Sequence, residues 1–423
     1  MERHDRIYDQ FIQIMKEELK PAMGCTEPIA IAYAAAKARE VLGKKPERLV
    51  VEVSGNIIKN VKSVVVPHTG GLRGIPAAAA AGAAAGDGSK ELEVISNVTE
   101  DGIAAMREFL STTPIEVKFA DTPNIFDIMI TAYSGTESSF VRIIEYHTNI
   151  VCIKKNGETV FEKKKTVKED GLTDRSVLSI ERIVEFGDIV DLDDVRELLE
   201  RQINYNMAIA EEGLRNNYGA NIGKTLLMQG NDLRMKLRAY AAAASDARMN
   251  GCEMPVVINS GSGNQGITTS VPVIVYARER GHSHEELLRA LTVANLVTTH
   301  LKTGIGRLSA YCGAVSAGCG CAAGLAFIKG GRFSEIAHTV VNAVAMNSGV
   351  VCDGAKASCA AKIASAVEAG ILGLEMFEAG NQFFGGDGIV KKGVENTIAS
   401  VSRLAKLGMA ETDKEIIRLM LDD

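Results

Sequence analysis

The chain has 423 residues and a formal net charge of −6; 46% of its residues are hydrophobic and 5% are aromatic, with no Trp. A chain of this length can form two domains of ordinary size, each burying its own apolar core. The modest acidic charge, without a dense basic patch to neutralise a phosphate backbone, argues against nucleic acid as a partner.

The N-terminus starts with charged residues and leads into an amphipathic helix, so it lacks the apolar segment of a signal peptide. No apolar run reaches the roughly 18 residues needed to span a bilayer. The Ala-rich stretch at 77–86 is too short for that purpose. We therefore expect a cytoplasmic protein with no membrane partner.

The first part of the chain predicts a mixed region. Two helices are expected over 1–45, the second beginning near residues 25–28, where Pro suits a first turn. The β-branched runs at 50–53 and 61–66 then predict strands, and a helix follows at 76–86. Four more strands precede a hairpin turn, at 115–119, 128–133, 140–146 and 150–155. Together these runs predict a sheet of five or more strands.

A charged segment at 162–175 has the composition of a connection between domains. After about residue 176 helical periodicity continues to the end, through Ala-rich stretches that would pack tightly. The sequence thus predicts an α+β fold, with N-terminal helices and a β-sheet region followed by a mostly α-helical domain rich in Ala and Gly. We expect an α+β domain over 1–170, whose helices at 1–45 dock on a helical catalytic domain over 171–423.

Eight cysteines are present, and disulfides are not expected in a chain read as intracellular. Five of them fall between residues 312 and 359, and such clustering favours metal ligation or catalysis over cross-linking. The eight lie at positions 25, 152, 252, 312, 319, 321, 352 and 359.

A glycine-rich segment at 260–266 contains the spacing G-x-G-x-x-G after a strand-like run at 256–258. We reject a dinucleotide fold because Pro272 follows too soon for a long helix and because no βαβ repeats surround the segment. Two interpretations remain, a structural turn and a polar loop that cradles a carboxylate or phosphate of a small substrate. The candidate binding residues are Ser260, Gly261, Ser262, Gly263, Asn264 and Gln265.

Cys25 lies at or just before a predicted helix N-terminus, where unpaired N–H groups lower the pKa of a thiol and favour thiolate. Such a thiolate could act as a base or nucleophile, although a lone Cys is more often a small inert core residue. His68 and His147 are further candidates for proton transfer because turn or polar residues flank both. A structural role remains the alternative for each histidine.

Cys312, Cys352 and Cys359 form the second constellation. Their spacing matches neither the ferredoxin run nor a zinc site. In one continuous helix the Cα atoms of Cys352 and Cys359 would lie about 10.5 Å apart, which is awkward for ligands of one cluster. We therefore expect a loop to carry Cys352, with Gly354 allowing the turn and Cys359 near the start of the next helix. If these three cysteines held an iron-sulfur cluster, one iron would have no protein ligand and could act as a Lewis acid.

Four other cysteines are assigned mainly to packing. Cys319 and Cys321 lie in an Ala/Gly-rich helix and are either packed side chains or spare ligands. Cys152 and Cys252 are treated as structural.

Taken in order, four segments of the chain resemble the L-cysteine desulfidase family, which is related to the α chain of iron-sulfur L-serine dehydratase. The segments are residues 24–28, 260–266, 307–312 and 352–355 with Cys359. The resemblance runs along nearly the whole chain. It implies an oxygen-sensitive 4Fe-4S enzyme that converts L-cysteine to pyruvate, ammonia and sulfide without pyridoxal phosphate.

Residue by residue, the resemblance makes Cys312, Cys352 and Cys359 the cluster ligands and Cys25 the proton acceptor. It makes the loop at 260–266 the counterpart of the loop that holds substrate in the dehydratases. The interval from Cys352 to Cys359 is shorter than in serine dehydratases, which favours desulfidase, and Cys319 and Cys321 lie outside the pattern. Serine dehydration and a non-catalytic amino-acid or redox sensor remain the alternatives, and the oligomeric state stays open.

Overall fold

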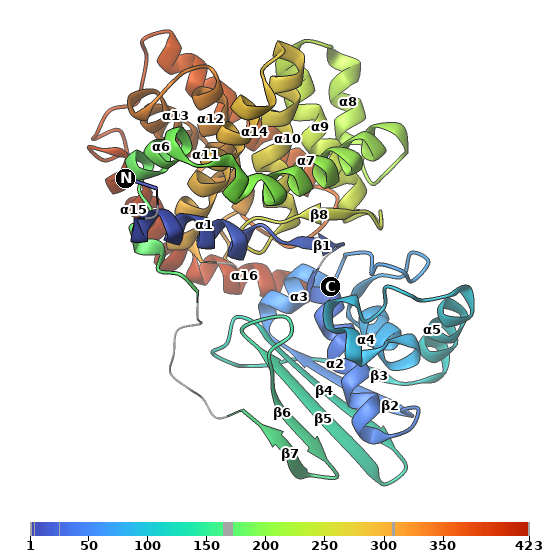
Figure 1. The fold of residues 1–423 in the computed structure, drawn as a ribbon. Helices are drawn as coiled ribbons and strands as arrows, with labels where there is room; N and C mark the ends of the chain where they lie inside the picture. Colours follow the sequence, from blue (N-terminus) through green and yellow to red (C-terminus); the bar gives the residue numbers. More distant parts are fainter. Residues whose placement is uncertain (1, 4, 25, 164–171, 307–308, 422–423) are drawn as a thin grey trace.

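The computed structural model describes residues 2–3, 5–24, 26–163, 172–306 and 309–421, and it folds into a helical body and a smaller body built on a β-sheet (Figure 1). The predicted α+β fold class is confirmed. Each body has its own cluster of buried apolar side chains. The division of the chain into domains at residue 170 stays a prediction, and it falls among residues that the structure does not describe.

The sheet has six strands in the order β3-β2-β4-β5-β6-β7. Only β2 and β3 are parallel, because the long connection between them carries helices, whereas the later strands follow one another as antiparallel hairpins. The strands are β2 (Arg48–Val53), β3 (Ile115–Phe119), β4 (Asp127–Ser134), β5 (Glu137–Ile144), β6 (Ile150–Lys155) and β7 (Glu158–Glu162). The predicted hairpin turn is confirmed between β6 and β7, where Asn156 and Gly157 both have positive φ.

Four helices accompany the sheet, and α2 lies against β4 and β5 with α4 packed on it. Gly82 of α4 allows this close packing, since a Cβ there would lie 1.9 Å from the carbonyl oxygen of Ala32 in α2. The four are α2 (Thr26–Leu42), α3 (Gly55–Val61), α4 (Gly74–Ala85) and α5 (Glu100–Thr112).

The strand expected at 61–66 is wrong. Residues 55–61 form α3, and Val65 makes only an isolated bridge with Arg73. The backbone here pairs across a local turn, where the amide of Val66 donates to the carbonyl of Leu72. The β-branched side chains of residues 61–66 are buried, although this segment does not join the sheet. Burial therefore outweighed the strand preference of these residues.

The helical body contains most of the remaining elements, with α12 at its centre. Every residue of α12 after Gly313 is buried, and small side chains let α11 and α14 approach it closely. The helices are α1 (Arg6–Glu18), α6 (Ile180–Ile189), α7 (Leu192–Arg215), α8 (Ile222–Gln229), α9 (Leu233–Met249), α10 (Gly263–Arg280), α11 (His284–Ile305), α12 (Gly313–Ile328), α13 (Phe333–Asn347), α14 (Cys359–Glu378), α15 (Val394–Arg403) and α16 (Ala410–Leu421). Short 3₁₀ turns occur at Gly88–Glu93 and Arg175–Val177 and a π turn at Leu404–Gly408.

The N-terminal segment joins the two bodies. Helix α1 belongs to the helical core, where Tyr8 and Phe11 contact Phe186 at ring-centroid distances of 5.2 and 5.0 Å. Strand β1 (Pro21–Met23) then pairs antiparallel with β8 (Pro255–Val257). Helix α2 belongs to the sheet core. The chain therefore passes from one body to the other between β1 and α2 (Figure 1).

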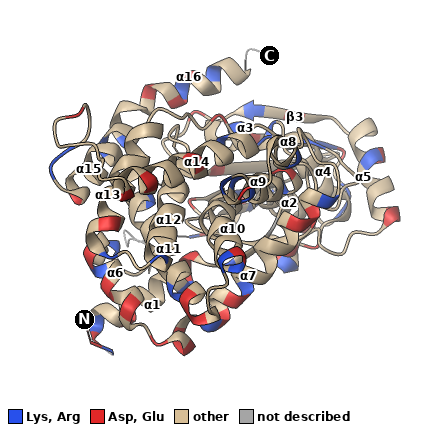
Figure 2. Ribbon diagram, turned by 90° about the horizontal axis from the view of Figure 1, so that it is seen from above, with Lys and Arg blue, Asp and Glu red and all other residues tan. Residues whose placement is uncertain are grey.

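Charged residues of both signs are mixed along outer helices such as α1, α5 and α7 (Figure 2). Within the described residues, no helix combines the length and the apolar content that crossing a membrane requires.

Candidate functional site

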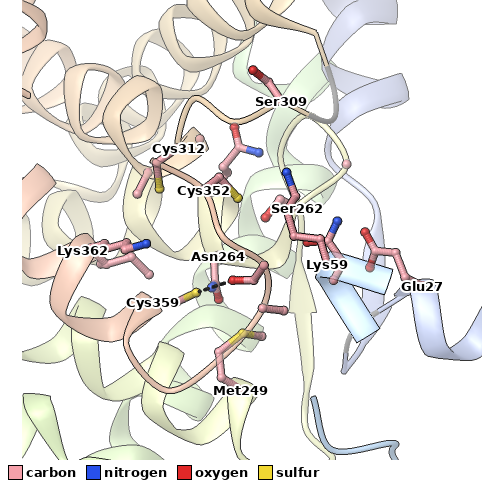
Figure 3. A pocket seen from close by; sticks show the side chains of 18 of the residues that line it. Glu27, Lys59, Met249, Ser262, Asn264, Ser309, Cys312, Cys352, Cys359 and Lys362 are labelled. Atoms are coloured by element: carbon pink, nitrogen blue, oxygen red, sulfur yellow. Dashed lines mark hydrogen bonds between the residues drawn. The ribbon is translucent and has the colours of Figure 1, made fainter. Parts of the chain in front are cut away.

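A cavity of about 130 Å³ opens where the two bodies meet, and it gathers segments that are far apart in the sequence. The sheet body contributes the first turn of α2 and the end of α3, and the helical body contributes the rest of the wall. Figure 3 shows the side chains that face this space. Its polar and sulfur-bearing lining residues include Thr26, Glu27, Lys59, Asn60, Arg248, Ser262, Asn264, Gln265, Lys302, Ser309, Cys312, Cys352, Cys359 and Lys362.

Backbone pairing brings two of the predicted ligand segments together. The amide of Cys312 donates to the carbonyl of Val350 at 3.0 Å, and the amide of Cys352 donates to the carbonyl of Ala310 at 2.6 Å. These bonds flank an isolated antiparallel bridge between Tyr311 and Val351. The two cysteines are thus fixed across a short two-stranded bridge, although 40 residues separate them in the sequence.

The third cysteine arrives through a turn. Cys352 lies outside any helix, Gly354 has a φ of +96°, and Cys359 begins α14, so the predicted loop geometry is confirmed. Gly354 also lies against α3, since a Cβ there would be 1.8 Å from the carbonyl oxygen of Lys59. The turn therefore packs directly on the sheet body.

All three thiols line the same cavity and influence one another electrostatically (Figure 3). Burial, together with the neighbouring Cys352 and Cys359, raises the pKa of the Cys312 thiol to about 12. Burial also raises the pKa of Cys359. Without a bound cation, Cys312 and Cys359 are therefore protonated at neutral pH, and binding a metal would have to displace these protons.

Among the described residues no three His, Cys, Asp or Glu side chains stand ready to hold a single metal ion. An iron-sulfur cluster makes a different demand, because its ligands surround a body a few ångströms across and do not converge on a point. Three thiols facing one cavity, with lysines beside them, are the soft donors and the positive surroundings that such a cluster requires. The donor set fits an iron-sulfur cluster.

The glycine-rich loop forms a second part of the cavity wall. Asn259 and Ser262 bridge each other, Ser260 and Gly261 adopt positive φ between them, and α10 begins at Gly263. Four members of the predicted set line the cavity, namely Gly261, Ser262, Asn264 and Gln265. Ser260 lines an adjoining cavity, and Gly263 packs against Arg248.

One reason for rejecting a dinucleotide fold was wrong. Helix α10 is 18 residues long, and Pro272 lies inside it, buried in the helical core. Pro272 removes one backbone donor, and tertiary packing of the surrounding apolar residues outweighs that loss. The rejection still holds on the other ground, since β8 pairs only with β1, in an antiparallel two-stranded sheet.

Cys25 lies outside the described residues, so its role as a base stays a prediction. Its neighbours reach the site, because Thr26 and Glu27 line the cavity. Arg248 donates from Nη2 to the carbonyl of Gly24 at 2.9 Å and from Nη1 to the side-chain oxygen of Asn264 at 3.2 Å. One buried guanidinium thus ties the residue before Cys25 to the glycine-rich loop.

The histidines and the other cysteines lie elsewhere. His68 lines a different cavity and contacts Glu253 at 3.2 Å, and His147 lines the adjoining cavity with its ring against Phe126. Cys319 and Cys321 are buried within α12, and neither lines the cavity. Cys252 is buried and Cys152 is half-buried in β6. Proton transfer by His68 or His147 stays a prediction.

Lys59, Lys302 and Lys362 line the cavity but were missed from the sequence. Each lies in a helical stretch made mostly of apolar or small residues, where a single lysine is unusual, and this was the available signal. Burial lowers the pKa of Lys302 to about 8, and the nearby Cys352 and Cys312 oppose that shift. Arg248 lies near the end of α9 and offered no comparable signal.

Comparison with known proteins places these residues in context. The sequence pattern of the family described as serine dehydratase alpha chain matches residues 89–418. A UPF0597 protein of Desulfitobacterium hafniense is 60% identical over 100% of this chain and 99% of its own length. UPF0597 proteins of Lachnoclostridium phytofermentans and Treponema denticola are 51% and 48% identical, each over 98% of this chain and over 100% and 98% of their own.

Proposed function

The chain belongs to the serine dehydratase alpha chain family, and from that premise we propose that it is an iron-sulfur-dependent lyase that converts L-cysteine to pyruvate, ammonia and sulfide. Family membership supports a lyase-like enzyme related to serine dehydratase. The choice of L-cysteine rests on the sequence resemblance and on the short interval between Cys352 and Cys359. We further propose that it acts in the cytoplasm on a free amino acid.

One observation carries the proposal. Thiols from three separate segments share a cavity with the glycine-rich loop and the first turn of α2 (Figure 3). Cys312, Cys352 and Cys359 would hold a 4Fe-4S cluster. That cluster would supply an open iron, which as a Lewis acid stabilises the negative charge on the departing heteroatom.

The rest of the proposed chemistry belongs to the chain. Donors of Ser262, Asn264 and the loop backbone bind the substrate carboxylate, and Arg248 keeps the loop beside the segment of Cys25. The Cys25 thiolate removes the α-proton, and the β-carbon–sulfur bond breaks to give aminoacrylate and sulfide. Aminoacrylate tautomerises, and water hydrolyses it to pyruvate and ammonia. The protein accepts one proton from the substrate and returns it to the products.

L-Serine is the second candidate substrate, and the family description favours it. The reaction would be the same elimination, with water as the leaving group. Only a direct comparison of the two amino acids separates these candidates.

The test is an anaerobic assay after reconstitution with iron and sulfide, measuring pyruvate from L-serine and both pyruvate and sulfide from L-cysteine. We expect turnover of L-cysteine by the wild type and a loss of at least about 100-fold in Cys352→Ala, because a ligand is removed. Cys25→Ala should keep its iron and lose turnover. Cys152→Ala, a half-buried thiol away from the cavity, is the matched control and should keep both.

Two results would contradict the proposal. Turnover of L-serine alone would make the chain a dehydratase. A protein that binds iron and sulfide yet turns over neither amino acid would indicate a sensor.

A further inference from the structure

The side chain of Lys302, near the C-terminal end of α11, differs from the other lysines of the cavity. It is only 4% exposed, and it makes no hydrogen bond or ion pair with any residue that the structure describes. Lys59 is equally buried but pairs with Asp413 of α16. Lys362 pairs with Asp353. Lys302 therefore brings a positive charge into the helical core without a carboxylate to balance it.

A buried cation without a partner carries a large desolvation cost. A neutral side chain of similar length, such as Met, would fill the same space between helices without that cost. The cost is offset only if something in the cavity supplies negative charge. The groups around Lys302 indicate what that is.

As thiolates, Cys352 and Cys312 are the groups that favour the Lys302 ammonium, and Lys59 opposes it from the α3 side. Arg248 adds a third buried cation to the same wall, beside Lys302 and Lys59. Glu27 is the carboxylate that lines this cavity, and it belongs to the first turn of α2. When the three cysteines bind as thiolates, their summed charge exceeds that of the cluster core, and the centre becomes a net anion.

We propose that Lys302 is the buried counter-charge of the iron-sulfur centre, and that it holds the centre in place and raises its reduction potential. This inference rests on the proposed function, because it requires the three cysteines to bind the cluster. Lys302 is a positioning residue here, acting on the centre through its charge and without contacting substrate.

The inference predicts opposite effects of one substitution in two states of the protein. In the metal-free protein, Lys302→Met removes an unbalanced buried charge, so the urea midpoint should rise above that of the wild type. In the reconstituted protein the same change removes the partner of an anionic centre. Iron should then be lost to a chelator about 10-fold faster or more, and the reduction potential should shift to more negative values.

Two further variants keep the test decisive. If Lys302→Met folds poorly, Lys302→Gln takes its place. It keeps a polar side chain without the charge and should show the same fast loss of iron. The double variant Lys236→Met/Glu279→Ala removes a lysine outside this cavity together with its carboxylate, so the net charge stays constant. It should leave the rate of iron loss and the potential close to the wild type.

The outcomes separate this inference from the function on which it rests. A wild type that takes up no iron and sulfide overturns both. Suppose that the wild type takes up iron and sulfide, but that Lys302→Met loses iron at the same rate and has the same reduction potential. The counter-charge role of Lys302 is then wrong, and the lyase proposal stands. If Lys302→Met lowers stability equally with and without iron, Lys302 is a packing residue and the inference fails.

Discussion

At the scale of single residues, Gly354 decides how the loop that carries Cys352 packs on the sheet body. Its φ of +96° favours glycine, and its Cα faces the backbone carbonyl of Lys59 so closely that a Cβ would overlap it. We expect Gly354→Ala to lower the free energy of unfolding by about 2–3 kcal/mol, from strain at positive φ and displacement of the loop. Urea denaturation measures this.

Gly349→Ala is the matched control in the same connection. Gly349 lacks a positive φ, and nothing lies within 4 Å of a Cβ built there. This change should alter stability by less than about 0.5 kcal/mol. Equal stabilities of the two variants would show that the close approach to Lys59 is not a constraint.

The residues that line the cavity differ in how clearly the sequence predicted them. Cysteines and the glycine-rich loop are rare residue types in recognisable order, so the sequence predicted Cys312, Cys352, Cys359 and four loop members that line the cavity. Lys302 and Arg248 were not predicted, because lysine and arginine are common: Lys302 had only the weak signal of a lysine in a mostly apolar helix, and burial alone distinguishes Arg248. Burial of one side chain depends on elements distant in sequence, which a single chain does not display.

At the scale of elements, one buried carboxylate links two helices. Asp246 of α9 accepts a hydrogen bond from the amide of Gly223 in the first turn of α8 at 2.9 Å. Burial is the main cause that raises the Asp246 pKa from 3.8 to about 6. Ionising Asp246 therefore costs more in the folded protein than in the unfolded chain.

The sign of the pH dependence follows. The stabilising contribution of protonated Asp246 is fully present below about pH 4 and is lost as the pH rises to about 6, by at most about 3 kcal/mol. Asp246→Asn cannot ionise, so its stability relative to the wild type should increase from pH 4 to 6 and then level off. Urea denaturation of both proteins across this range measures the difference, and a difference independent of pH would contradict the assignment.

Prediction of elements succeeded where one periodicity dominated and failed where two signals competed. The strands of the sheet and the Ala-rich helices have a clear period, and they formed where expected. The valines at 61–66 and Pro272 in α10 are the exceptions. In both cases contacts with distant elements outweighed the local preference of the residues.

At the scale of the whole molecule, α16 returns the end of the chain to the sheet body. Asp413 of α16 pairs with the buried Lys59 of α3 and also accepts a hydrogen bond from Asn56 at 3.1 Å. Asp413→Ala would leave a buried ammonium unpaired, and we expect a loss of about 2–4 kcal/mol of unfolding free energy. Denaturation of this variant and of Lys59→Met/Asp413→Ala provides the measurement.

The double variant should recover much of the loss, because no unpaired charge remains buried. Glu411→Ala removes the exposed pair with Lys414 on the same helix and should cost less than about 0.5 kcal/mol. A similar cost for Asp413→Ala and Glu411→Ala would mean that α16 does not fasten the two bodies through this pair.

Residues from both bodies line the cavity, and this arrangement limits how the gene can be divided during evolution. Helices α2 and α3 supply one side and the helical body the other, so neither body alone encloses the site. A gene interrupted between β7 and α6 would leave α1 and β1 with the sheet fragment, so the helical fragment would lack part of its apolar core and neither fragment would enclose the cavity. Selection for an intact cavity therefore keeps both parts in one reading frame, or demands that separate products find each other in the cell.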